Sequence, residues 1–181
     1  MTKSYRQILG NPVLHFEQGT VLGVVRDVII HPDTGRLEGL WIKPTGRLLA
    51  FGVLQTQDIV EWKKNIYVKD EGSIAEAHDV IKISEILADG RLIMGKRVRT
   101  EAGETVGRVV NLDFDTEQYY LRHLYTQKSV LGLWAYDSRI LNYDLILEVL
   151  PDYILIKDKT AKAEKIKVPL IKEKDVLLDP Q

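Results

Sequence analysis

Hydrophobic and polar residues alternate along most of the chain with the period of two that is typical of β-strands. Residues 20–30 are rich in β-branched side chains and contain Gly23, which predicts a long strand with a bend or bulge at that glycine. The segment from His31 to Gly35 predicts a hairpin turn, because Pro32 fixes an early turn angle and Gly35 supplies a positive φ. The chain then returns as a partner strand.

The same pattern occurs a second time further along the chain. Gly19 to Val28 is matched by Gly103 to Leu112 at an offset of 84 residues. Residues 66–70 are matched by residues 154–158 at an offset of 88, so the second copy contains a short insertion. Each copy contains five or six short strands, which favours an all-β fold of two small barrels in tandem.

Short helices are expected where the chain enters each copy. Ser4 and Ser84 are suitable N-cap residues, and each is followed six residues later by a glycine, Gly10 or Gly90. We expect residues 1–80 to form the first barrel, residues 81–162 to form the second, and residues 163–181 to form a C-terminal tail.

The order of these motifs resembles the PRC-barrel domain family. The first copy carries Gly10-x-x-Val13, then Gly23-x-Val-x-Asp27 with aliphatic residues after it, and then an Asp-Thr-Gly hairpin with a leucine-rich return strand. The second copy comprises Gly95 to Leu124 and Ile146 to Ile156, and it departs from the pattern at Asn111 and in a turn without glycine. The resemblance therefore predicts tandem PRC-type barrels.

Relatives implied by this resemblance are the cytoplasmic domain of the photosynthetic reaction centre H subunit and the C-terminal domain of the ribosome maturation factor. Their common feature is a barrel used for protein contacts, without shared catalytic residues. The resemblance thus carries over only framework positions of this sequence, which are Gly23, Asp27, Gly35, Gly95 and Gly107.

Composition removes several classes of function. The 181 residues are 45% hydrophobic and 28% charged with a net charge of −1, as expected for a folded chain without a global affinity for polyanions. The absence of cysteine excludes disulfides, thiolate nucleophiles and iron–sulfur clusters. The most apolar stretch, residues 48–54, is too short to span a bilayer, and residues 1–10 do not lead into a signal-peptide core. A cytoplasmic location follows by elimination, and peripheral attachment to a membrane complex stays open.

Candidate chemical groups are sparse. The four histidines lie 16 or more residues apart, which favours isolated polar roles over a metal site. Asp113, Asp115 and Glu117 are interpreted as a turn rich in local hydrogen bonds, with hard-cation binding as the alternative. Asp27 is assigned a structural hydrogen-bond role. The sequence contains no phosphate-binding glycine loop and no nucleophile motif, so we expect no catalytic residues, no cofactor and no metal.

Two asymmetric segments are candidates for partner binding. An apolar cluster that the first copy lacks predicts a protein-binding patch made of Leu131, Leu133, Trp134 and Tyr136. The alternative is that this cluster closes the barrel end or packs between the copies. The tail carries seven lysines between Lys157 and Lys174, which suits RNA or an anionic membrane surface, or else a solvated segment.

These observations together favour a non-enzymatic protein-interaction or adaptor module. Two alternatives are a ribosome- or RNA-associated maturation factor and an electron- or proton-transfer accessory subunit. We expect a protein partner and regard nucleic acid as an alternative partner for the lysine-rich tail. Whether the protein forms a homo-oligomer is open.

Overall fold

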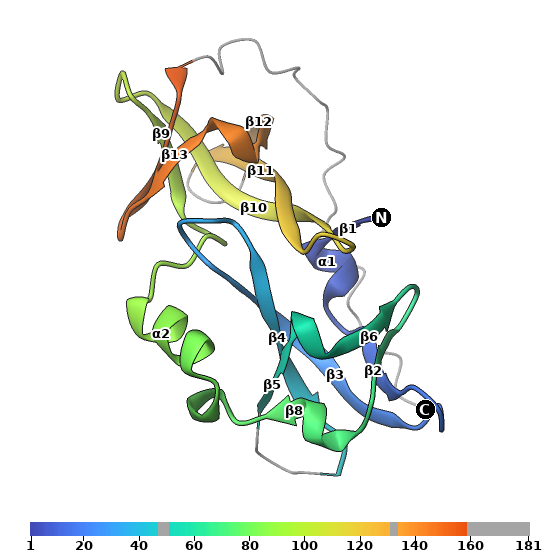
Figure 1. Ribbon diagram of the computed structural model, residues 1–181. Helices are drawn as coiled ribbons and strands as arrows, with labels where there is room; N and C mark the ends of the chain where they lie inside the picture. The colour runs from blue at the N-terminus through green and yellow to red at the C-terminus, as the bar shows by residue number, and fades with distance from the viewer. Residues whose placement is uncertain (47–50, 131–133, 159–181) are drawn as a thin grey trace.

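The computed structural model describes residues 1–46, 51–130 and 134–158 and has the expected all-β fold (Figure 1). Its strands form two curled sheets. The first sheet contains β2 (Pro12–His15), β3 (Val21–Ile30), β4 (Leu37–Pro44), β5 (Gly52–Gln55), β6 (Ile59–Trp62), β7 (Ile66–Val68) and β8 (Ile74–Ala75). The second contains β1 (Thr2–Ser4), β9 (Arg97–Thr100), β10 (Thr105–Asp115), β11 (Tyr120–Val130), β12 (Trp134–Asn142), β13 (Ile146–Val149) and β14 (Tyr153–Ile156).

Both sheets have the same strand order. The first runs β6-β7-β2-β3-β4-β5 and the second runs β13-β14-β9-β10-β11-β12. In each, one pair is parallel, β2 with β7 and β9 with β14, and the other neighbours along these six-strand orders are antiparallel. The pairings among the described residues do not join the two ends of either sheet. The sheets differ in their seventh strand, since β8 extends the first at β5 whereas β1 pairs with β10 in the second.

The two repeated glycines occupy the bulges that the sequence predicts. Gly23 pairs with Val13, Gly107 pairs with Val98, and the strand register shifts directly beside each glycine. Gly107 has a φ of +142°, and a Cβ atom there would lie 2.7 Å from the carbonyl oxygen of Gln127. A side chain at this position would therefore collide with the backbone of β11.

The hairpin tips of the two sheets pair with each other. The Leu37 N–H donates to the Tyr119 carbonyl oxygen at 2.8 Å, and the Leu121 N–H donates to the Gly35 carbonyl oxygen at 2.9 Å. Because Gly35 matches Tyr119 and Leu37 matches Leu121 at the offset of 84, each bond repeats the other with the sheets exchanged. This is the self-complementary geometry of a two-fold interface, formed here within one chain.

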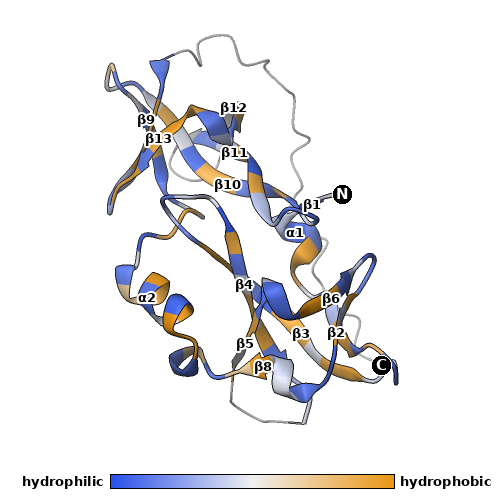
Figure 2. Cartoon of the chain, viewed as in Figure 1, coloured by the Kyte–Doolittle hydropathy of each residue, from blue (hydrophilic) through white to orange (hydrophobic). Residues whose placement is uncertain are grey.

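Side chains strengthen this junction. The Tyr119 ring lies 6.2 Å from the Trp62 ring between centroids, although Tyr119 itself has a positive φ of 57°. Buried residues of both sheets, such as Leu40 and Leu124, belong to one hydrophobic cluster. The strands that cross this region carry mixed hydrophobic and hydrophilic segments in Figure 2, as expected when one face of a sheet is buried.

In the described part of the chain there are two α-helices, one directly before β2 and one before β9. Helix α1 (Tyr5–Ile8) begins after Ser4, whose side chain accepts from the Gln7 N–H, so the predicted N-cap is confirmed. Helix α2 (Ile81–Asp89) ends at Gly90 in the left-handed conformation, also as predicted, but it begins earlier than expected. The predicted N-cap at Ser84 is wrong, because the Ser84 hydroxyl lies inside the helix and donates to the Ile81 carbonyl at 2.7 Å.

Shorter elements complete the fold. Within the ranges that the structure describes, there are four single-turn 3-10 helices: η1 (Thr56–Asp58), η2 (Glu71–Ser73), η3 (Ala77–Asp79) and η4 (Tyr143–Leu145). Helix α2 packs Ile83 against Ile29 and Val53 of the first sheet. No helix within the described ranges has the length and apolar character needed to cross a membrane.

Candidate functional site

The predicted protein-binding patch lies at the margin of what the structure describes. Leu131 and Leu133 are outside the described residues. Trp134 and Tyr136 are in strand β12, but their side chains are outside the described part as well. Of the tail lysines, only Lys157 is described, and its ammonium donates to the Asp144 carbonyl at 3.2 Å. The patch and the tail therefore stay predictions.

The acidic residues singled out from the sequence have local roles. Asp115 accepts from the N–H groups of Glu117 and Gln118 at 2.9 and 3.1 Å, which confirms the turn interpretation. A hydrogen bond from Arg122, followed in importance by these N–H groups, lowers the Asp115 pKa to about 2. Asp113 accepts from the Tyr125 hydroxyl at 2.6 Å.

The structural role assigned to Asp27 is confirmed. Its carboxylate accepts from the Tyr5 hydroxyl at 3.0 Å and from the Val28 N–H at 2.8 Å, which connects α1 to the outer side of β3. Burial, together with the nearby Asp27 charge, raises the pKa of Tyr5 to about 12. Tyr5 therefore stays a hydrogen-bond donor at neutral pH.

The histidines also act locally. His15 accepts from the Glu17 N–H at 3.2 Å, and His31 accepts from the Asp33 N–H at the same distance. In the described part of the chain, no three histidine or carboxylate side chains gather into a group that could hold a metal ion.

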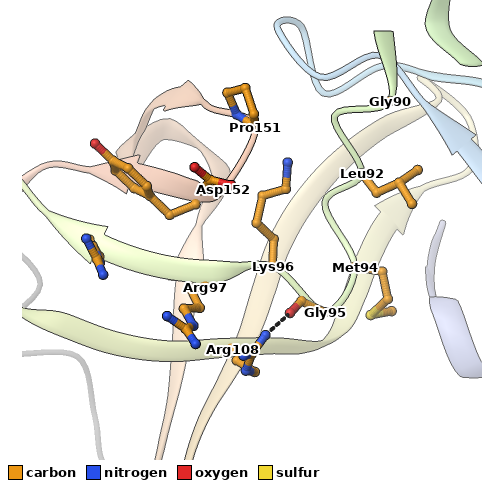
Figure 3. Close-up of a pocket in the computed structure, with 11 residues that line it drawn as sticks. Gly90, Leu92, Met94, Gly95, Lys96, Arg97, Arg108, Pro151 and Asp152 are labelled. Atoms are coloured by element: carbon orange, nitrogen blue, oxygen red, sulfur yellow. Dashed lines mark hydrogen bonds between the residues drawn. The ribbon is translucent and has the colours of Figure 1, made fainter. Parts of the chain in front are cut away.

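A pocket in the second sheet has a different character (Figure 3). Its volume is about 640 Å³, and it lies between the segment that leads into β9, strand β9 itself and the β13–β14 turn. Four cationic side chains line it: Lys96, Arg97, Arg99 and Arg108. Asp152 is the single carboxylate among the lining residues.

The three arginines share one face of the sheet because of strand geometry. Alternate residues of a strand point to opposite sides, so Arg97 and Arg99 are exposed while Val98 between them is buried. Arg108 of β10 is the direct register partner of Arg97 and is also exposed. Two like charges thus stand opposite each other across adjacent strands, an arrangement that disfavours folding.

Intramolecular contacts leave much of this positive charge uncompensated. The Arg108 guanidinium donates to the Gly95 carbonyl at 3.2 Å, and the Arg99 guanidinium lies 5.2 Å from the centre of the Tyr153 ring. Within residues 1–46, 51–130 and 134–158, none of the pocket's four cations forms an ion pair with a carboxylate. The ion pairs in these ranges are made by other cationic side chains.

Lys96 stands between the two walls of the pocket. Figure 3 shows its side chain between Asp152 of the β13–β14 turn and Leu92 of the opposite wall. Its ammonium donates to the Leu150 carbonyl at 2.7 Å. Partial burial, followed by the nearby Arg91 charge, lowers the pKa of Lys96 from its usual 10.5. A bound anion would offset both effects.

Arg91 holds the wall formed by residues 90–96. Its guanidinium donates to both carboxylate oxygens of Asp33 at 2.6 and 2.9 Å, and to both oxygens of Asp89 at 2.7 Å. It also donates to the Val149 carbonyl at 3.1 Å. Through Arg91, the hairpin tip of the first sheet and the end of β13 fix one side of the pocket.

The residues that line the pocket suit the binding of an anionic group. Its lining residues include no serine, threonine, cysteine or histidine, which are common parts of a nucleophilic site. Its cationic groups match carboxylates and phosphates, and Arg pairs with such groups through two parallel hydrogen bonds. Leu92, which is 70% exposed, adds an apolar contact at the rim.

No sequence motif indicates this pocket, but a difference between the two copies at matched strand positions does. The first sheet has Pro12 and Val24 as the register pair that corresponds to Arg97 and Arg108, and Leu14 corresponds to Arg99. At these matched strand positions the first copy has partly buried apolar residues, whereas the second copy has exposed arginines. The sequence predictions covered only the apolar loop and the lysine tail as asymmetric binding segments, so the arginine positions were not identified.

Comparison with known families identifies one part of the chain. Residues 1–75 match the PRC-barrel domain family. The matched region includes all strands of the first sheet and ends at the last residue of β8, so the resemblance drawn from the first copy is confirmed. Strands β9 to β14 lie outside the match, and a second PRC-type copy stays a prediction. A search of curated proteins found no match.

Proposed function

We propose that this protein is a non-enzymatic adaptor module built from two PRC-type barrels, and that a partner protein docks at the cationic pocket of the second sheet. The observation that carries the proposal is the exposed face formed by Arg97, Arg99 and Arg108, where the first sheet has apolar residues. The PRC-barrel match supports a general module without shared catalytic residues.

The energetic cost of the cationic face supports a binding role. Arg97 and Arg108 stand directly opposite each other, and like charges in that position destabilise a sheet. The apolar pair of the first sheet shows that the same framework accepts residues without this repulsion. An anionic partner would remove the repulsion on binding and is a physical reason for the arginines.

The pocket supports an adaptor more directly than the two alternative functions. A proton- or electron-transfer accessory role would need a connected path of titratable groups, whereas His15 and His31 each accept from nearby backbone N–H groups. A ribosome- or RNA-associated role would use the same cations, so it is an outcome of the experiments below. The patch around Trp134 and the lysine tail remain additional candidate surfaces.

Affinity capture with matched charge reversals tests the proposal. The full chain, the double variant Arg97→Glu/Arg99→Glu and the control Arg26→Glu are used to capture proteins from an extract of the native cells. Arg26 is an exposed arginine of the first sheet, on β3. We expect a protein captured by the unchanged chain and by the Arg26 control to be lost with the double variant.

The interaction is then repeated with the purified partner. Direct binding that falls with Arg97→Glu/Arg99→Glu, while the urea midpoint of the variant stays near that of the unchanged chain, supports the pocket as the docking surface. Equal binding by both variants would contradict the proposal. In that case, Trp134→Ala and a truncation after Lys157 would show whether the predicted patch or the tail holds the partner.

A further inference from the structure

We infer that the pocket recognises an extended protein segment that carries two acidic side chains at alternate positions, with a large apolar side chain beside them. This inference rests on the proposed function, because it names the ligand of the same pocket. It follows from the spacing of the arginines, from the apolar rim and from the properties of the one aromatic residue in the lining.

The spacing of the cations matches an extended chain. Successive residues of a strand rise by about 3.3 Å, so Arg97 and Arg99 are separated by about 7 Å along β9. Acidic side chains at alternate positions of an extended segment have the same separation. Arg108 lies beside Arg97 across the sheet, so one carboxylate can contact both of these guanidinium groups.

Contacts within the protein restrict the position of Arg99 in the pocket. The Arg99 guanidinium lies over the Tyr153 ring at 5.2 Å, a contact that limits the freedom of a long side chain before any ligand arrives. The segment from Gly95 to Lys96 is also fixed, since the Gly95 N–H donates to the Val109 carbonyl at 3.0 Å. A preformed site loses less conformational entropy on binding.

The rim beyond the arginines is apolar. Leu92 is 70% exposed, and Met94 lines the pocket beside it on the segment that precedes β9. Figure 3 shows Leu92 and Met94 on the same wall of the pocket. An extended ligand along β9 would place its next side chain on this face near that wall, so an apolar residue two positions from the acidic pair fits there.

Two features favour a peptide over a nucleic acid. Tyr153 is the only aromatic residue among the lining residues, and the Arg99 guanidinium covers one face of its ring, which leaves less surface for a stacked base. Asp152 places a negative charge at the pocket rim, which would repel a dense line of phosphates. A peptide with only two carboxylates carries less negative charge than a run of phosphates and is repelled less by Asp152.

Fluorescence anisotropy with defined probes tests the inference. The first probe is a labelled peptide with the sequence Gly-Leu-Ser-Glu-Ser-Glu-Ser-Gly, and its matched control replaces both Glu by Gln. A ten-nucleotide oligothymidine is the third probe. We expect the Glu peptide to bind about tenfold or more tightly than the Gln peptide, because each paired carboxylate contributes a charge-assisted hydrogen bond.

Variants of the full chain assign this binding to the pocket. Arg97→Gln/Arg99→Gln should lose about tenfold or more of the affinity for the Glu peptide, whereas Arg26→Gln should keep it. Urea midpoints of both variants show whether the fold is intact. Equal binding of the Glu and Gln peptides, or tighter binding of the oligothymidine, would overturn the inference.

The failure of this inference differs from the failure of the proposed function. If the captured partner depends on Arg97 and Arg99 but the Glu peptide does not bind, the docking surface stands and the ligand class is wrong. If the Glu peptide binds through these arginines but partner capture is unaffected by their reversal, the ligand class stands and the partner's docking surface lies elsewhere.

Discussion

The two sheets have the same strand order, but at one matched register pair the first has apolar residues and the second has arginines. Pro12 faces Val24 in the first sheet, and Arg97 faces Arg108 in the second. The glycines that set the bulges, Gly23 and Gly107, are kept in both. Residues that fix the backbone are therefore shared, while other residues of the same strands differ. This difference is where we propose the binding site.

The hairpin tips show the same contrast in backbone conformation. Gly35 has a φ of +67°, which glycine adopts at little cost, whereas Tyr119 at the matching position adopts a φ of 57°. The second sheet accepts this cost because the Tyr119 ring packs on Trp62 of the first sheet. The positive φ of the first tip is accommodated by a glycine, and that of the second tip by the packing of Tyr119 on the other sheet.

The largest expected effect comes from the bulge glycine of the second sheet. Gly107→Val should lower the free energy of unfolding by about 3 kcal/mol, because it adds backbone strain to a collision with Gln127. Urea denaturation measures this as a reduced midpoint. A midpoint equal to that of the unchanged chain would show that the bulge has no need of glycine.

Two matched glycines separate the causes. Gly103, like Gly107, has a positive φ (+83°), but an added Cβ would lie in open space. Gly103→Ala should therefore lower the free energy of unfolding by only about 1 kcal/mol. Gly23→Val tests the first sheet, where a Cβ would lie 2.6 Å from the Ile42 side chain without a positive φ. We expect its effect to lie between the other two.

The next effect concerns the wall of the pocket. Arg91→Ala removes the hydrogen bonds to Asp33, Asp89 and the Val149 carbonyl, and should destabilise the protein by about 1.5 kcal/mol. It should also weaken binding of the acidic peptide without touching the three arginines. Calorimetry and anisotropy on the same variant measure both effects. Unchanged peptide affinity would show that the wall forms without its contact to the first sheet.

Much of the framework could be predicted from the sequence, because its signals are local. The bulges follow from glycines inside β-branched segments, and the first hairpin turn follows from Pro32 and Gly35, which lie a few positions apart. The pairing of Leu37 with Tyr119 and the pocket could not be read in this way. Both join segments that are far apart in the chain, and no single segment of the pocket carries a binding motif.

The start of α2 shows why one local signal failed. Ser84 is a good N-cap residue, but Ile83 packs against Ile29 and Val53, so the helix extends backwards to include this contact. Packing outweighs the capping preference, since burying an isoleucine stabilises by more than one capping hydrogen bond. The serine hydroxyl then bonds within the helix instead.

A smaller effect is expected from acid at the second hairpin tip. The Asp115 pKa is lowered from 3.8 to about 2, so its stabilising contribution is complete above pH 3.8 and is lost as the pH falls through about 2. The partner Arg122 is half exposed, so the contribution is about 1 kcal/mol.

Asp115→Asn isolates this contribution, because an amide oxygen can still accept from the N–H groups of Glu117 and Gln118. The unchanged chain should be more stable than this variant at about pH 5, and the difference should shrink at about pH 2. Urea midpoints at both pH values give the comparison. A difference that is constant with pH would mean that the charge of Asp115 has no part in the stability.

The smallest expected effect has the opposite sign. Arg108→Val gives the second sheet the residue that the first sheet has at Val24, and removes the repulsion from Arg97. The free energy of unfolding should rise by about 0.5 kcal/mol, while binding of the acidic peptide weakens. A variant that is less stable and still binds would show that the arginines serve the fold and not a ligand.

Strand β1 has a consequence for the order in which the newly made protein folds. Thr2 to Ser4 pair with Asp113 to Asp115, which are synthesised more than a hundred residues later. At roughly 5 to 20 residues per second, translation takes on the order of 10 s to reach that partner. The first sheet, whose strands all lie within residues 12–75, can fold during this interval. Until residues 113–121 are made, strand β1 and the hairpin tip of the first sheet lack their pairing partners. Slower elongation would lengthen the time in which these unpaired backbone edges can aggregate.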